Sequence, residues 1–83
     1  MEFVVTFYSH FDGILFKKEF EKKDIEVKLG PVPRRLSSSC GTAAFFSTKR
    51  AVAEKALEGL SGISIEQIVL SSGEAYEVLY DFR

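Results

Sequence analysis

Segments with the apolar periodicity of strands and of helices alternate along this chain, and their order limits the folds that it can adopt. Residues 3–8 are β-branched and aromatic, which is typical of a buried strand. Residues 25–29 alternate apolar and charged side chains, so they predict a strand with one buried face. The other predicted elements are strands at residues 41–46 and 63–70, a helix from Ser9 to about Lys23 and a helix at residues 49–60. The predicted order is therefore β-α-β-β-α-β.

That order predicts an α+β protein, a ferredoxin-like split β-α-β two-layer sandwich with two helices over one antiparallel sheet. Residues 76–82 alternate again after a Ser-Gly turn, so we expect an extra C-terminal edge strand. In this topology the loop after the second strand returns to the edge where the first strand ends. We therefore expect Cys40 and the turn at residues 9–11 to share one end of the sheet, beside the partly positive N-terminus of the first helix.

Both predicted helices carry signals at their ends. Ser9 and Asp12 have the spacing of a capping box, with Asp in place of the more usual Glu or Gln. Ser47 or Thr48 is expected to cap the second helix. The charged side chains at residues 17–23 are typical of the solvated face of an amphipathic helix.

The composition indicates one small globular domain, which we expect to span residues 1–83. Hydrophobic residues make up 46% of the chain and charged residues 28%, which excludes a disordered chain. The formal net charge is -1 and the basic residues are scattered, so no nucleic-acid partner is expected. The N-terminal residues lack the features of a signal peptide or a membrane span, so we expect a cytoplasmic protein with no membrane partner.

Cys40 is the only cysteine, and it lies in the loop Pro-Val-Pro-Arg-Arg-Leu-Ser-Ser-Ser-Cys-Gly at residues 31–41. Small, polar and cationic neighbours favour a reactive thiolate, although a passive connector with Cys40 facing the core is also compatible with the pattern. No second cysteine is present to resolve a mixed disulfide, which argues against a thiol-disulfide oxidoreductase. One cysteine and one histidine are too few for a structural zinc site, so we expect neither a metal nor a cofactor.

This loop, the strand-helix-strand unit before it and the helix after it resemble the selenium/sulfur carrier-like family over nearly the whole chain. The most specific part is Pro-x-Pro-Arg at residues 31–34 followed by Ser-Ser-Ser-Cys-Gly at residues 37–41. The resemblance implies a carrier more than a self-contained enzyme, with Cys40 holding a persulfide or perselenide that donor and acceptor proteins load and remove. The chain departs from the family pattern after Gly41, where Ala-Ala-Phe-Phe at residues 43–46 supplies no basic residue.

In this interpretation the cationic and polar residues of the loop support the sulfur. Arg34 and Arg35 would bind an anionic donor or stabilise the thiolate, because guanidinium groups stay charged. Hydroxyl groups would donate hydrogen bonds to the charged sulfur, and these belong to Ser37, Ser38 and Ser39.

Gly41 and His10 complete the candidate site. Gly41 permits a positive φ or a close approach of the backbone. His10, the only histidine, is either a base beside Cys40 or a surface residue at the start of a helix.

A different class of function fits the same loop. The chain is then a non-catalytic interaction or anion/ligand-binding module, with the loop from Gly30 to Gly41 as its binding site. In either case the aromatic C-terminal tail leaves an apolar row at a sheet edge, so we expect a homodimer through the C-terminal strand.

Overall fold

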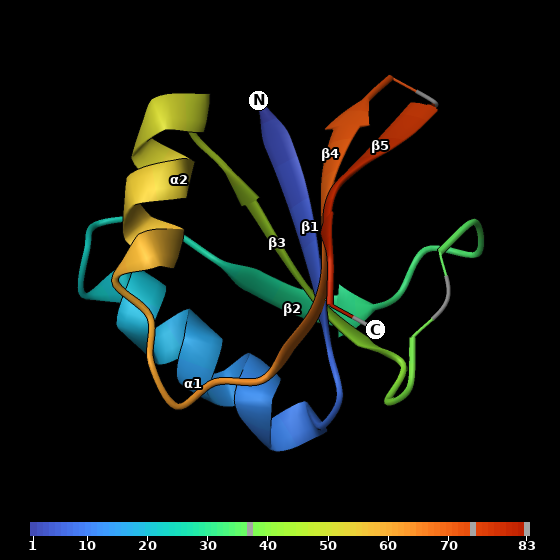
Figure 1. The fold of residues 1–83 in the computed structure, drawn as a ribbon, viewed down its shortest axis with the longest axis horizontal. Coiled ribbons are helices and arrows are strands. Elements are labelled where there is room, and N and C mark those ends of the chain that lie inside the picture. The colour runs from blue at the N-terminus through green and yellow to red at the C-terminus, as the bar shows by residue number, and fades with distance from the viewer. Residues whose placement is uncertain (37, 74, 83) are drawn as a thin grey trace.

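A computed structural model describes residues 1–36, 38–73 and 75–82, and it confirms the predicted α+β class (Figure 1). Two helices pack on a five-stranded antiparallel sheet. The elements are β1 (Glu2–Phe7), α1 (His10–Glu21), β2 (Lys28–Pro31), β3 (Thr42–Ser47), α2 (Arg50–Glu58), β4 (Ile65–Ser72) and β5 (Ala75–Asp81).

The strand order in the sheet is β2-β3-β1-β4-β5, and every neighbouring pair is antiparallel. The central strand β1 pairs with β3 and with β4, so β3 lies between β1 and β2. The expected C-terminal edge strand is present as β5, which pairs with β4 alone. The ends of β1 and the starts of β3 and β4 therefore meet at one end of the sheet.

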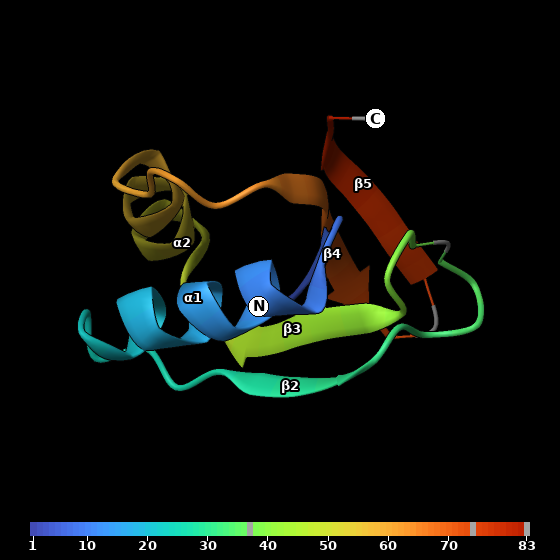
Figure 2. The ribbon, with the colours of Figure 1, turned by 90° about the horizontal axis from the view of Figure 1, so that it is seen from below.

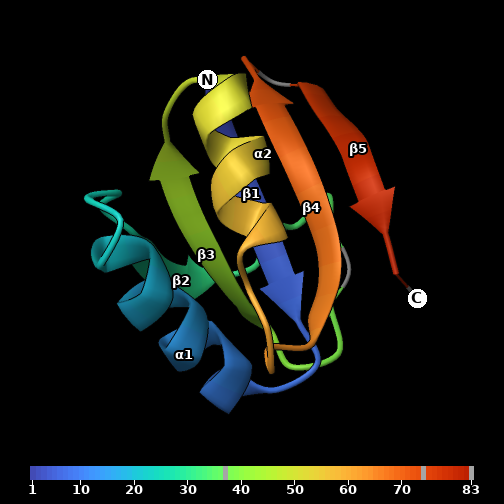
Figure 3. The same ribbon diagram turned by 60° about the vertical axis from the view of Figure 1, so that its left-hand side comes forward.

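Both helices cover the same face of the sheet (Figure 3), and the main core lies beneath them. Alternate residues of β1, namely Phe3, Val5 and Phe7, point into this core, as the period-2 geometry of a strand requires. The α1 side chains Phe16 and Phe20 stack with ring centroids 4.2 Å apart. Phe16 also contacts Phe7 of β1 with ring centroids 5.3 Å apart, and Phe20 contacts Phe46 of β3 at 4.9 Å. These contacts fix α1 against the strands whose ends carry the Cys40 loop.

The opposite face, which we call the open face, has a smaller apolar cluster, and neither α1 nor α2 covers it. Figure 2 shows α1 and α2 on the same side of β2 and β3. Buried Val4, Ala43 and Val69 form the centre of the open-face cluster. The partly buried side chains packed against them are Val32, Leu36, Phe45 and Tyr76. Part of the loop after β2 therefore folds over the open face.

The start of α1 agrees with the sequence, whereas the start of α2 does not. Ser9 caps α1, and its Oγ accepts a hydrogen bond from the Asp12 amide at 3.3 Å. The predicted cap of the second helix at Ser47 or Thr48 is wrong, because β3 continues to Ser47 and the Thr48 amide donates to the Met1 carbonyl. The N-cap is Lys49, whose side chain makes no capping hydrogen bond.

The second strand begins later than its alternating pattern predicts. Ile25 and Val27 are buried in the core as expected, but they precede the ladder of β2. The Ile25 amide donates to the Phe20 carbonyl, and Lys17 Nζ donates to the Val27 carbonyl at 2.7 Å. These backbone groups are therefore hydrogen-bonded to α1 and not to a neighbouring strand. Pro31 ends the strand without conflict because β2 is an edge strand.

Across the described parts of the chain, both helices are too short and too polar to span a membrane.

Candidate functional site

The Cys40 loop and the start of α1 meet at one end of the sheet, as the topology predicts. Cys40 Sγ donates a hydrogen bond to the Phe7 carbonyl at 3.2 Å and lies 3.9 Å from the Thr42 carbonyl. Phe7 is the last residue of β1 and Thr42 is the first of β3. The sulfur therefore lies between the ends of two neighbouring strands.

Cys40 is half-buried. Its position lies between the two considered from the sequence, an accessible reactive thiol and a side chain that faces the core. Its side chain packs against the helix-covered core, yet it is not enclosed by that core. Gly41 follows with φ +74°, a backbone conformation that side-chain-bearing residues rarely adopt. Of the two options considered for Gly41, a positive φ or a close backbone approach, this residue has the positive φ, which turns the chain from Cys40 into β3.

His10 lies beside the same loop but is bonded to Thr42. It is the first residue of α1, it is exposed, and its Nδ1 lies 2.9 Å from Thr42 Oγ1. Because Cys40 also approaches the Thr42 carbonyl, His10 and Cys40 flank one residue of β3. Only the Nε2 of His10 is left for another partner in this arrangement.

The described serines of the loop make their hydrogen bonds to the sheet. Ser38 Oγ donates to the Phe7 carbonyl at 3.5 Å. Ser39 Oγ donates to Glu66 Oε2 at 2.6 Å, and the Ser39 amide donates to the same carboxylate at 3.2 Å. Ser37 lies outside the described residues.

Glu66 is a residue of the candidate site that the sequence reasoning missed. It lies in β4, only 1% of it is exposed, and it also accepts a hydrogen bond from Thr6 Oγ1 at 3.2 Å. Burial raises the pKa of Glu66, but the hydrogen bonds from Ser39 and Thr6 outweigh it and leave the pKa below its ordinary value. The side chain is therefore a carboxylate at neutral pH. A lone acidic residue inside the apolar run 63–70 was the available signal.

A β-bulge gives Glu66 its position. Thr6 pairs with Gln67 and Phe7 pairs with Ile65, so Glu66 is the extra residue of β4 at this point. An extra residue of this kind redirects side chains near the end of a ladder. The bulge thus supplies the carboxylate next to the loop that carries Cys40.

Arg34 and Arg35 lie at a different place from the sulfur. They are exposed in a turn, and with Pro33, Gly73 and Tyr76 they line a hollow of about 300 Å³. Tyr76 packs on the open-face cluster, whereas Cys40 packs on the helix-covered core. The two halves of the loop therefore serve opposite faces of the sheet.

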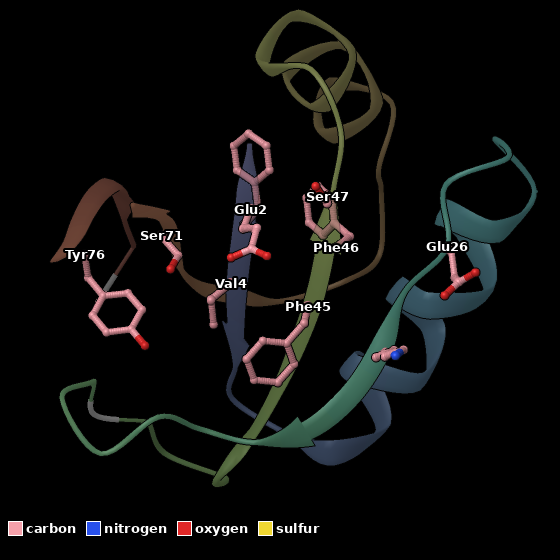
Figure 4. A pocket seen from close by; sticks show the side chains of 10 residues that line it. Glu2, Val4, Glu26, Phe45, Phe46, Ser47, Ser71 and Tyr76 are labelled. Atoms are coloured by element: carbon pink, nitrogen blue, oxygen red, sulfur yellow. The ribbon is translucent and has the colours of Figure 1, made fainter. Parts of the chain in front are cut away.

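A larger cavity of about 550 Å³ also lies on the open face. Figure 4 shows Tyr76 and Phe45 on either side of Val4, with the carboxylate of Glu2 nearby. Glu26 and Lys28 add opposite charges to its lining. Tyr76 lines both this cavity and the arginine hollow, so the two spaces adjoin.

The described residues contain no group of three or more His, Cys, Asp and Glu side chains that would suit a metal ion. Cys40 and Glu66 are both engaged with the backbone or side chains of the loop and its neighbouring strands. The chemistry available at this end of the sheet is therefore that of a thiol held by carbonyl groups, with a histidine and a carboxylate nearby.

Comparison with known proteins agrees with the family resemblance of the loop. The model of the family described as "Putative Se/S carrier protein-like" matches residues 2–70, which include β1 to β3, both helices and the Cys40 loop. The match ends within β4, so β5 lies beyond it. Searches of curated proteins and of solved structures found no match. The chain therefore belongs to the Se/S carrier protein-like family.

Proposed function

We propose that residues 1–83 form one carrier domain, in which Cys40 holds sulfur or selenium as a persulfide or perselenide between a donor and an acceptor protein. The observation that carries the proposal is the position of the only cysteine, half-buried at the end of the sheet within the part of the chain that matches the family. Partial exposure of Cys40 would let a partner protein approach a cargo atom there, while the core packs against the other side of the residue.

The transfer needs one nucleophilic displacement and no redox partner. The Cys40 thiolate attacks the outer sulfur of a persulfide on the donor enzyme, and the bond between the two donor sulfurs breaks. The electron pair of that bond stays on the inner sulfur of the donor, which leaves as a thiolate. Cys40 then carries the outer sulfur, and an acceptor thiolate removes it by the same step in reverse. Loading removes the hydrogen bond that the Cys40 thiol donates to the Phe7 carbonyl, because the loaded sulfur no longer carries that proton.

Arg34 and Arg35 fit the anion-binding role better than the thiolate-stabilising role. Their hollow adjoins the open face, and a guanidinium group stabilises a thiolate only at close range. We propose that they attract anionic groups of the donor or acceptor protein during docking. The Nδ1 atom of His10 is hydrogen-bonded to Thr42. We propose that its Nε2 atom takes up or releases the proton of the donor's or acceptor's thiol.

The remaining features of the proposal concern architecture, assembly and location. The position of β3 between β1 and β2 supports a ferredoxin-like split β-α-β arrangement.

Edge strand β5 exposes Val78 and Tyr80, which supports a homodimer through that edge. A Val78→Lys change should then give monomers in gel filtration, and unchanged elution would remove the dimer. We also propose a cytoplasmic location, because a single unpaired thiol persists better in a reducing compartment.

Loading of the purified protein by a cysteine desulfurase tests the function. After incubation with the desulfurase and free cysteine, intact mass should show one added sulfur atom that reduction removes. A Cys40→Ser variant is the matched control and should gain nothing. An unchanged mass of the wild-type protein, with Cys40 inert to alkylating reagents, would refute carriage.

A binding module is the second candidate, and the open-face cavities favour it specifically. Arg34 and Arg35 give the smaller hollow an anion-binding character, and Phe45 and Tyr76 give the larger cavity aromatic walls. On this alternative a ligand occupies the open face and Cys40 has no chemical role. If the wild-type protein gains no sulfur and the Cys40→Ser variant still binds its ligand on the open face, the binding module is favoured over the carrier.

A further inference from the structure

A buried carboxylate beside the Cys40 loop has no part in the displacement described above. Only 1% of Glu66 is exposed, and its partners include both donors of Ser39, the residue that precedes Cys40. A buried charge is costly unless hydrogen bonds replace its hydration. The Ser39 hydrogen bonds therefore do two things at once, because they keep the charge ionised and tie the loop to β4.

We propose that Glu66 is a positioning residue, whose carboxylate holds Ser39 and thereby fixes the Cys40 sulfur against the Phe7 carbonyl. The fixing of the loop stands on geometry alone. Its importance for sulfur transfer rests on the proposed function.

Two anchors flank Cys40 in the sequence, which is why its sulfur has a defined place. On one side, Ser39 Oγ lies 2.6 Å from Glu66 Oε2. On the other, the Gly41 carbonyl accepts a hydrogen bond from the Val32 amide at 3.2 Å. Loss of either anchor frees one side of Cys40, and only the Glu66 anchor includes a charged group.

A carboxylate suits this position because every group directed at it is a donor. Thr6 Oγ1 supplies one hydrogen bond, and the amide and hydroxyl of Ser39 supply two more. An ionised carboxylate accepts all of them, whereas the amide of a glutamine would turn its own N–H groups toward one donor. Hydrogen bonds to an ionised acceptor are also stronger than neutral ones.

The held loop has opposite consequences for small reagents and for a protein donor. Packing against the core shields one side of the sulfur, so a small alkylating reagent reaches it more easily once the loop is free. A donor enzyme must meet the sulfur in one orientation, so a free loop lowers its rate of transfer. A role confined to global stability would not separate these two rates.

Alkylation of Cys40 by iodoacetamide at constant pH tests the proposal in Ser39→Ala and Thr6→Val variants. Both variants remove a hydroxyl hydrogen bond to Glu66, but only Ser39→Ala loosens the loop, which then keeps just the backbone amide bond of residue 39 to the carboxylate. We expect Ser39→Ala to raise the alkylation rate by about tenfold, since a lost hydrogen bond to a charged group raises the open population by about that factor. Thr6→Val should stay within about twofold of the wild type.

Rescue and loading complete the test. Ser39→Thr keeps the hydroxyl and should restore the wild-type alkylation rate, and loading by a desulfurase should be slower in Ser39→Ala than in Thr6→Val. Equal alkylation rates of Ser39→Ala and Thr6→Val at matched stability would overturn the positioning role. Faster alkylation of Ser39→Ala without any loading of the wild-type protein would instead keep the positioning role and refute the carrier function.

Discussion

The two halves of the loop between β2 and β3 differ in almost every physical respect. The arginine half, residues 32–36, packs on the open face through Val32 and Leu36 and exposes both guanidinium groups. The cysteine half, residues 38–41, is tied to the sheet through Ser39 and to the helix-covered core through Cys40. The difference teaches that residues adjacent in a loop motif can work on opposite faces of a sheet.

The contrast also separates positioning from attraction. Hydrogen bonds to the buried carboxylate of Glu66 hold the cysteine half. Exposed arginine residues can instead attract an anionic partner over a distance. We therefore propose that chemistry belongs to the cysteine half and docking to the arginine half. Variants in each half should fail in different assays.

The largest effect on stability is expected from Glu66→Ala. It leaves the buried Thr6 hydroxyl without an acceptor and removes the charged partner of Ser39, so the free energy of unfolding should fall by about 3 kcal/mol. Urea denaturation monitored by circular dichroism measures the loss.

Arg34→Ala is the matched control from the other half. Arg34 is exposed, so the same measurement should change by less than about 0.5 kcal/mol. A similar loss in both variants would contradict the distinction between a half held by a buried carboxylate and a half whose arginine side chains are exposed.

Acid should first weaken the hydrogen bonds that hold the cysteine half to Glu66. The lowered pKa of Glu66 means that its carboxylate stabilises the fold and that protonation removes this stabilisation. The stabilising effect is complete above the unfolded-state pKa of about 4.3 and is lost as the pH falls through the lower folded-state pKa. The difference in unfolding free energy between the wild type and Glu66→Gln should therefore narrow below about pH 4.3. Urea titrations at a series of pH values measure it, and a constant difference would mean that the carboxylate is not the stabilising form.

Removal of both arginines should slow loading from a protein donor by a few-fold and leave loading from inorganic polysulfide unchanged. Arg34→Ala with Arg35→Ala removes charges that attract an anionic partner, but no contact of the sulfur with the sheet. Rates of mass gain with each donor make the comparison. An equal slowing with both donors would place the arginines at the sulfur itself.

The smallest effect is expected from His10→Ala on alkylation by a small reagent. His10 bonds Thr42 and leaves the hydrogen bonds of Cys40 untouched, so the alkylation rate should change by less than about twofold. A large change would show that His10 sets the reactivity of the thiol directly.

Local patterns predicted the helices, the strands and the shared end of Cys40 and the start of α1. These follow from periodicity and from the direction of each strand, which a sequence displays residue by residue. The capping role of Ser9 also followed from local spacing, as its hydrogen bond with the Asp12 amide confirms.

Long-range features were not accessible in that way. The role of Glu66 depends on a bulge in the pairing of β1 with β4 and on a contact with Ser39, which lies far away in the sequence. The place of Arg34 depends on a turn that crosses to the open face. Ile25 and Val27 are buried as predicted, but they do not pair with a neighbouring strand. Their backbone groups are hydrogen-bonded to residues of α1.

Release of a loaded sulfur atom tests the carrier function most directly. The protein is loaded by a cysteine desulfurase, separated from it and treated with cyanide, which removes the outer sulfur of a persulfide as thiocyanate. We predict one equivalent of thiocyanate per chain, with Cys40 recovered as a free thiol and no thiocyanate from Cys40→Ser. No thiocyanate from the wild-type protein, or equal amounts from both proteins, would contradict the account.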